Sequence, residues 1–104
     1  MEQPHIYKLI DMLQSYTLIS QSIPIKDHQY VCGYVIPKQK LIIFNKNNPY
    51  KINLETLAHE TIHIYYHNKN ITVTEDYVEQ LSKQYLNLYP EYYEELEDKL
   101  SELK

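Results

Sequence analysis

Two histidines, His59 and His63, are spaced so that both could bind one metal ion. Residues four apart on an α-helix project from the same face, about one turn from each other. The surrounding sequence is expected to be helical, so both imidazoles would reach one ion at roughly 2.0–2.1 Å, the distance that zinc requires. The pair therefore predicts a site for a single zinc ion in each chain.

Glu60 directly follows the first histidine, in the sequence His59-Glu60-Thr61-Ile62-His63. On a helix its carboxylate would lie beside the open position of the ion without binding the metal. There it could take a proton from a water molecule and later pass it to a leaving amine. The motif thus predicts a zinc-dependent metallopeptidase that hydrolyses peptide bonds, with Glu60 as the catalytic residue.

A third protein ligand must come from elsewhere in the chain. His67 continues the four-residue spacing, but it lies about 12 Å along the helix axis from His59, too far for both to bind one ion. Glu75 and Glu79 are four apart on the next expected helix, which must fold back across the first after a short loop. One would bind the metal, and the other would accept a hydrogen bond from the far nitrogen of a bound histidine. We favour Glu75 as the ligand and Glu79 as the hydrogen-bond acceptor, and the reverse assignment stays open.

Both glutamates also have purely structural explanations. Thr72 and Glu75 fit a capping box, in which Glu75 would only stabilise the start of its helix. Glu79 would then belong to a solvent-exposed helix face. His67 is best explained as a histidine at a helix C-terminus, where the helix dipole favours it.

The elements that must position these residues begin with a short helix after Pro4. Its apolar positions have helical spacing; they are Ile6, Leu9, Ile10, Leu13 and Tyr16 or Thr17. Residues 20–24 end this helix. Two runs rich in β-branched residues follow, 30–36 and 40–45, and the short polar link between them predicts an antiparallel hairpin.

Three more helices complete the expected fold. Asn53 would cap a helix from Leu54 to about His67, and Thr72 or Thr74 would start another that runs to about Leu88. After Tyr89-Pro90, residues 91–103 form a last acidic helix with one apolar side. Residues 1–104 are therefore predicted to be a single α+β domain: an N-terminal helix, a small antiparallel β-sheet, the helix with the histidines, the glutamate helix and a C-terminal helix.

At these residues the chain resembles the gluzincin metallopeptidases, in which HExxH is followed by a glutamate and by an acidic residue four positions later. Residues 75–82 are similar to the glutamate helix of the CAAX prenyl protease and HtpX-like membrane enzymes. In those enzymes an Ala-Asp pair follows the ligand glutamate, and Val78 and Glu79 stand at these two positions here. The resemblance implies a zincin-like fold, with His59, His63 and Glu75 as zinc ligands and Glu79 as their hydrogen-bond partner.

The size and element order are most similar to the minigluzincins, soluble chains that correspond to the catalytic core of those membrane enzymes. That resemblance implies an endopeptidase made as a zymogen, with residues 90–104 as a latency segment. The same residues could instead form a homodimer interface or simply close the core. Related enzymes bind an extended peptide along an edge strand of the sheet, which we expect to be residues 40–45. A tyrosine could donate a hydrogen bond to the oxyanion.

The composition narrows the choice of partners. The net charge is −4 and arginine is absent, which argues against nucleic acid. A single glycine excludes a glycine-rich phosphate loop, and the lone Cys32 is expected to be a buried, inert thiol. No signal pattern or apolar run of membrane-spanning length occurs in the sequence. We therefore expect a soluble cytoplasmic protein that acts on a peptide or protein substrate, without a membrane partner.

Three other interpretations fit the same residues. Residues 33–63 resemble the ImmA/IrrE-type metallopeptidases associated with repressor cleavage, which normally accompany a DNA-binding domain. A non-catalytic regulatory or interaction module would use zinc only to hold two helices together, and a protein ligand would close the fourth position. A metal-free helical domain that dimerises through its last helix would bind no zinc.

Overall fold

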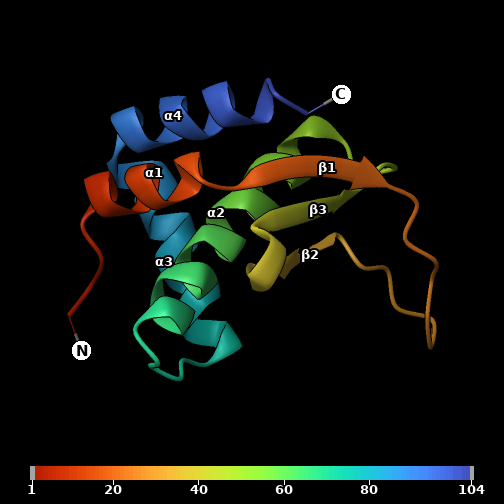
Figure 1. Ribbon diagram of the computed structural model, residues 1–104, viewed down its shortest axis with the longest axis horizontal. Coiled ribbons are helices and arrows are strands. Elements are labelled where there is room, and N and C mark those ends of the chain that lie inside the picture. Colours follow the sequence, from red (N-terminus) through yellow and green to blue (C-terminus); the bar gives the residue numbers. More distant parts are fainter. Residues whose placement is uncertain (1, 104) are drawn as a thin grey trace.

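Residues 2–103, the part of the chain that the computed structural model describes, contain four α-helices and three β-strands. In chain order they are α1 (Ile6–Gln14), β1 (Thr17–Gln21), β2 (Gly33–Ile36), a 3-10 turn (Pro37–Gln39), β3 (Leu41–Asn45), α2 (Tyr50–Asn68), α3 (Glu75–Leu88) and α4 (Pro90–Leu100). The helices gather at one side of the molecule and the sheet lies at the other (Figure 1). This mixture of separate helices and a small sheet confirms the α+β class.

The sheet is mixed, with the strand order β1-β3-β2. β2 and β3 form the predicted antiparallel hairpin, in which Tyr34 pairs with Ile43. β1 runs parallel to β3, with Thr17 opposite Leu41. The prediction of an entirely antiparallel sheet was therefore wrong, because it missed β1.

Two further predictions, the end of the first helix and the choice of edge strand, were wrong because β1 was not predicted. The first helix ends at Gln14, and the residues expected to end it, 20–24, partly belong to β1. β3 lies in the centre of the sheet, so the predicted edge strand was also wrong, and β1 and β2 are the edges. Four successive residues of β3, Ile42 to Asn45, are buried, as is typical of a strand with neighbours on both sides.

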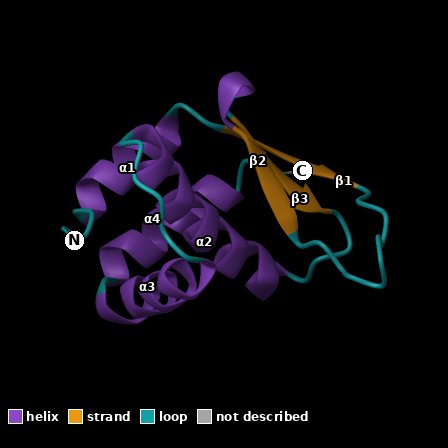
Figure 2. Ribbon diagram, turned by 90° about the horizontal axis from the view of Figure 1, so that it is seen from below, coloured by secondary structure: helices purple, strands orange, loops and turns teal. Residues whose placement is uncertain are grey.

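One face of the sheet packs against the helices, as Figure 2 shows. Leu18, Ile42 and Phe44 point into the shared hydrophobic core from this face. On the opposite face Ile43 lies between its strand neighbours Ile19 and Tyr34 and is only 3% exposed. Gln21 donates a hydrogen bond to the Tyr34 hydroxyl (3.0 Å), which links the two edge strands across β3.

α2 is the central element, since it contacts the other three helices and two of the strands. Its buried residues surround much of the helix rather than forming one stripe; they are Leu54, Leu57, Ala58, Thr61, Ile62, Ile64, Tyr65 and Tyr66. The helix begins at Tyr50 after Pro49, not at the predicted cap Asn53. The Asn53 side chain instead accepts a hydrogen bond from Asn48 (2.9 Å), because it already lies inside the helix.

The turn into α3 determines what Glu75 is free to do. Asn70 adopts a left-handed conformation (φ 58°) after the end of α2. Thr74 is the N-cap of α3, and its hydroxyl accepts a hydrogen bond from the Tyr77 amide (3.1 Å). Glu75 is therefore the first residue of the helix, two positions too early for a capping box with Thr74. The capping box with Thr72 is not formed, so the Glu75 carboxylate is available for other contacts.

Gly33, the only glycine of the chain, lets β2 lie close to α2. A Cβ atom at this position would be 2.5 Å from the Ile43 carbonyl oxygen and 3.1 Å from the Thr56 methyl group. Real side chains do not tolerate the first contact, which is with β3, and the second is tight, so any other residue would disturb both the pairing of β2 with β3 and its packing on α2. The glycine thus holds the edge strand β2 beside the part of α2 that precedes His59.

α4 packs into the core through Tyr92, Leu96 and Leu100, which are at most 5% exposed. Two further hydrogen bonds fix its outer side, from Tyr7 to Glu91 (2.7 Å) and from Tyr50 to Glu97 (3.0 Å). The proposed roles of residues 90–104 in latency or dimerisation stay predictions, and residue 104 lies outside the described part. Within residues 2–103, no helix combines the length and apolar composition needed to cross a membrane.

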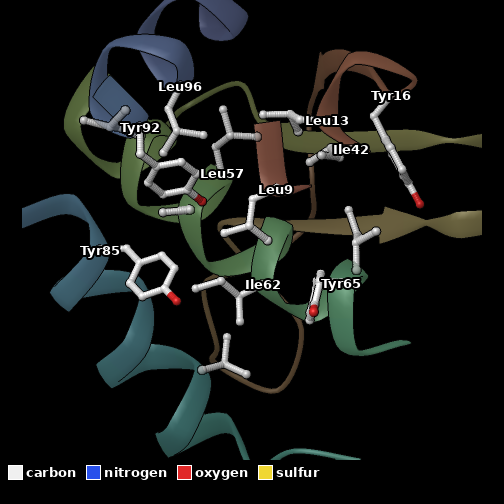
Figure 3. Packing of buried hydrophobic residues seen from close by; sticks show 14 of the residues in the cluster. Leu9, Leu13, Tyr16, Ile42, Leu57, Ile62, Tyr65, Tyr85, Tyr92 and Leu96 are labelled. Atoms are coloured by element: carbon white, nitrogen blue, oxygen red, sulfur yellow. The ribbon is translucent and has the colours of Figure 1, made fainter. Parts of the chain in front are cut away.

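Tyr85 and Tyr92 lie among the packed hydrophobic side chains of the core (Figure 3). Their hydroxyl groups differ in hydrogen bonding. Tyr85 donates its hydroxyl hydrogen to the Pro4 carbonyl, which ties the N-terminal segment to α3. Tyr92 is fully buried, and its hydroxyl has no hydrogen-bond partner among the described residues. Thr61, which lies near it, donates its own hydroxyl hydrogen to the Leu57 carbonyl (2.6 Å).

This contrast predicts that removing the hydroxyl group changes stability differently at Tyr85 and at Tyr92. Tyr85→Phe should lower the free energy of unfolding by about 1 kcal/mol, because the buried Pro4 carbonyl loses its donor. Tyr92→Phe should leave it unchanged within about 0.5 kcal/mol or raise it, since the lost hydroxyl satisfies nothing. Urea unfolding of both variants and the wild type measures the difference. Equal losses in the two variants would contradict this account of the core.

Candidate metal centre

α2 and α3 bring the predicted site residues together at the surface of the molecule. The Glu75 carboxylate lies against both histidines, with Oε2 3.0 Å from His59 Nε2 and Oε1 2.9 Å from His63 Nε2. The histidine side chains are 20% and 28% exposed, so they are partly covered, while the glutamate reaches them from the solvent side. One turn of helix thus presents two imidazole nitrogens to a single carboxylate of the neighbouring helix.

The donor set fits a zinc ion. Two nitrogens and a carboxylate oxygen are ligands that zinc accepts in tetrahedral sites. Ligands about 2.1 Å from a tetrahedral ion are about 3.4 Å apart, so the Glu75 carboxylate, which contacts each ring through a different oxygen, must move away from both rings to admit one. Donor atoms of His59, Glu60 and His63 also lie within 4.8 Å of one another and could hold a metal ion.

Glu79 lies behind the first histidine, as expected for a hydrogen-bond partner. Its carboxylate is 3.0 Å from His59 Nδ1, while Nε2 of the same ring faces Glu75. If Nδ1 carries the proton, it donates to Glu79 and leaves the Nε2 lone pair for a metal. These contacts are compatible with the favoured assignment, Glu75 as ligand and Glu79 as hydrogen-bond acceptor of His59, which stays a prediction.

Lys83 is a member of this network that the sequence analysis did not single out. Its ammonium group lies 3.2 Å from Glu79, one helical turn away on α3. Burial opposes ionisation of Glu79, but the hydrogen bond from Lys83 and the charge of His59 outweigh it and lower the pKa of Glu79. Glu79 therefore stays ionised and can hold the His59 ring. The four-residue spacing of Glu79 and Lys83 could have revealed the pair.

Burial changes the proton affinity of the two other residues of the motif. It raises the pKa of Glu60 to about 7, with the charge of Glu75 adding to the rise and that of His59 opposing it. Burial also lowers the pKa of His63, against the pull of Glu75. A neutral histidine is the form that binds metal. A carboxylate with increased proton affinity is suited to carrying a proton between two partners.

A cleft of about 450 Å³ opens beside these residues. His59 and Glu60 line it from α2, Glu75 and Glu79 from α3, and Gly33 from the edge strand β2. Further lining residues that the sequence analysis did not place here are Cys32, Ile52, Glu55, Thr56, Ser82, Lys83 and Leu86. Among the described residues that line the cleft there is no tyrosine, so the expected tyrosine donor is not found in it.

Of the remaining candidates, His67 lies apart from the centre, whereas Cys32 lines the cleft. His67 is exposed near the end of α2, as its position in the sequence suggested. Cys32 is half-buried at the start of β2 rather than fully buried, and its carbonyl accepts hydrogen bonds from Asn45 and Asn48.

Comparison of the chain with known protein families, with curated proteins and with solved structures gives no match. Five side chains that α2 and α3 bring together are therefore the basis for inferring a function, namely His59, Glu60, His63, Glu75 and Glu79. The likeness to gluzincins stays a resemblance carried by these residues and their spacing.

Proposed function

We propose that this chain is a small zinc-dependent metallopeptidase of the gluzincin type. One observation carries the proposal: the Nε2 atoms of His59 and His63 both face the Glu75 carboxylate, at 3.0 and 2.9 Å. Glu60 lines the cleft beside them, and its carboxylate lies within 4.8 Å of a donor nitrogen of each histidine. Two imidazoles, a carboxylate and an adjacent unligated glutamate are the parts that metal-assisted peptide hydrolysis needs.

In this proposal each side chain has a separate task. His59, His63 and Glu75 hold the ion, and Glu79 fixes the ring of His59 through Nδ1. A bound zinc ion supplies Lewis-acid chemistry, because it polarises a carbonyl and makes a water molecule more acidic. Glu60 accepts the proton of the attacking water and delivers it to the nitrogen of the departing amine. Its partial burial keeps the transferred proton from exchanging freely with solvent.

The edge strand β2 supplies a binding surface for the peptide. Its pairing partner β3 lies on one side only, so its other edge can accept an additional strand. Gly33 of this strand lines the cleft, and a peptide added along β2 would run past the candidate centre. We therefore assign to β2 the role that the sequence analysis gave to residues 40–45, which lie in the middle of the sheet.

One observation favours a second candidate, a non-catalytic module stabilised by zinc. The donor atom of Glu60 lies within 4.8 Å of those of both histidines, so Glu60 could itself close the fourth position. A closed site holds helices together but leaves no room for a reacting water. The two functions therefore differ in whether Glu60 is a ligand.

The direct test is zinc content measured together with peptide cleavage. Protein purified without added metal is dialysed against zinc, and the bound ions are counted by mass spectrometry. A peptidase should hold about one zinc per chain and cleave a mixed peptide library, and chelation by EDTA should stop cleavage until zinc is restored. A chain that binds no zinc after this dialysis would contradict both candidate functions. Stoichiometric zinc without cleavage would fit the non-catalytic module and a latent peptidase alike, and the zinc affinity of Glu60→Gln would then distinguish them.

A further inference from the structure

Glu55 is a charged residue of the cleft that the proposed chemistry does not use. It lies on α2, one turn before His59 and on the same face of the helix, and it lines the cleft. The residue is half-buried. Within residues 2–103 its side chain has no hydrogen bond or ion pair, unlike Glu75 and Glu79, which contact His59. Its carboxylate is therefore free to pair with a cationic group that enters the cleft.

Glu55 differs from the other glutamates of the cleft in that no nearby cation compensates its charge. Four glutamates and one lysine line it: Glu55, Glu60, Glu75, Glu79 and Lys83. Lys83 neutralises Glu79 at 3.2 Å. A divalent cation between the histidines would offset the charges of Glu60 and Glu75. Among the described residues that line the cleft, Glu55 then carries the one charge that nothing compensates.

The walls near Glu55 are suited to a long side chain with a charged end. Ile52 precedes it on α2, and Leu86 lies across the cleft on α3. Both are half-buried. Lysine and arginine pack their aliphatic stems on apolar surfaces while the charged group finds an acidic partner. The net charge of −4 also attracts cationic peptides over longer distances.

We propose that Glu55 selects substrates, favouring peptides that carry a lysine or arginine close to the scissile bond. This inference rests on the proposed peptidase function and names its substrate class. Residues four apart on a helix are separated by about 6 Å, and an extended peptide advances about 3.3 Å per residue. A peptide whose scissile bond lies at His59 therefore presents to Glu55 a side chain one or two residues away.

The first experiment compares cleavage of a proteome-derived peptide library by four zinc-loaded proteins: the wild type, Glu55→Gln, Glu55→Lys and Glu94→Lys. Glu94 is exposed on α4, so Glu94→Lys changes the net charge equally without altering the cleft. Wild type and Glu94→Lys should prefer lysine or arginine over glutamate near the cleaved bond by about tenfold, the effect of one partly screened ion pair. Glu55→Gln should lose the preference, and Glu55→Lys should reverse it. Unchanged preference in Glu55→Lys would overturn the inference.

A binding measurement separates this inference from the peptidase function itself. Glu60→Gln protein, loaded with zinc, is titrated with two blocked octapeptides of alanine, glycine and leucine that differ at one central residue, lysine or glutamate. The lysine peptide should bind about tenfold more tightly, and adding Glu55→Lys should abolish that advantage. Equal binding of both peptides, or binding of neither, would overturn the role of Glu55. If no protein cleaves the library but the lysine peptide binds selectively, the peptidase function fails while the selectivity of the cleft stands.

Discussion

Zinc binding should be lost when His59 or Glu75 is replaced with alanine. The two side chains, 3.0 Å apart, would supply two of the three protein ligands, so either variant keeps only two ligands, too few to hold the ion firmly. Loss of a residue that merely orients a ligand lowers metal affinity about 10- to 100-fold, so loss of a ligand must have a larger effect. We therefore expect about one zinc per wild-type chain and essentially none in either variant after the same dialysis.

The loss of zinc binding should also be visible in the thermal stability, which is measured without an activity assay. At a free zinc concentration 100 times Kd, the ion stabilises the folded chain by about 2.7 kcal/mol. For a domain of about 100 residues, each 1 kcal/mol shifts Tm by about 4–8 °C. Zinc should therefore raise the Tm of the wild type by about 10–20 °C and that of His59→Ala hardly at all. Differential scanning calorimetry with and without zinc measures both shifts.

Two further variants serve as a control and as a comparison for the loss of zinc binding. His67 lies on the same helix but is exposed and far from the centre, so His67→Ala should bind zinc like the wild type. Glu79→Ala should retain the ion with affinity reduced about 10- to 100-fold, because Glu79 only supports His59. If Glu79→Ala lost zinc completely and Glu75→Ala kept it, the two glutamates would have exchanged roles.

The local features of the site could be predicted from the sequence because they depend on helical spacing alone. Four-residue separations place His59 with His63 and Glu75 with Glu79 on single helix faces, whatever the rest of the fold. The short link between the helices forces them to pack back on each other, which brings Glu75 to the histidines. Thr74 as cap also frees the Glu75 side chain.

Features that depend on contacts between distant segments could not be predicted in this way. The helical spacing of apolar residues up to Tyr16 concealed the end of α1 and the start of β1, and only pairing with β3 shows that residues 17–21 form a strand. Because β1 was not predicted, β3 was wrongly expected to be an edge strand of the sheet. Glu55 belongs to the cleft only because α3 and β2 enclose it, although its four-residue distance from His59 was visible in the sequence.

Replacing Glu60 with glutamine is the second change with a large expected effect. Glutamine has nearly the same shape but cannot accept a proton, so the attacking water and the leaving amine lose their proton carrier. General acid–base catalysis typically contributes 10²- to 10⁴-fold, and we expect kcat for a cleaved peptide to fall by about that factor. Zinc affinity should change by less than about threefold, since Glu60 is not a ligand in the catalytic arrangement.

Measuring both kcat and zinc affinity in Glu60→Gln decides between a metallopeptidase and a non-catalytic module stabilised by zinc. In a zinc-stabilised module Glu60 closes the fourth position, so glutamine in its place would weaken zinc binding and lower the zinc-dependent gain in Tm. In a peptidase the same substitution would leave both unchanged and remove only turnover. Glu60→Asp adds a further test, because a shorter carboxylate still accepts a proton but from a displaced position. Partial recovery of kcat in Glu60→Asp, with zinc retained in both variants, would show that the carboxylate acts on the reacting atoms rather than on the metal.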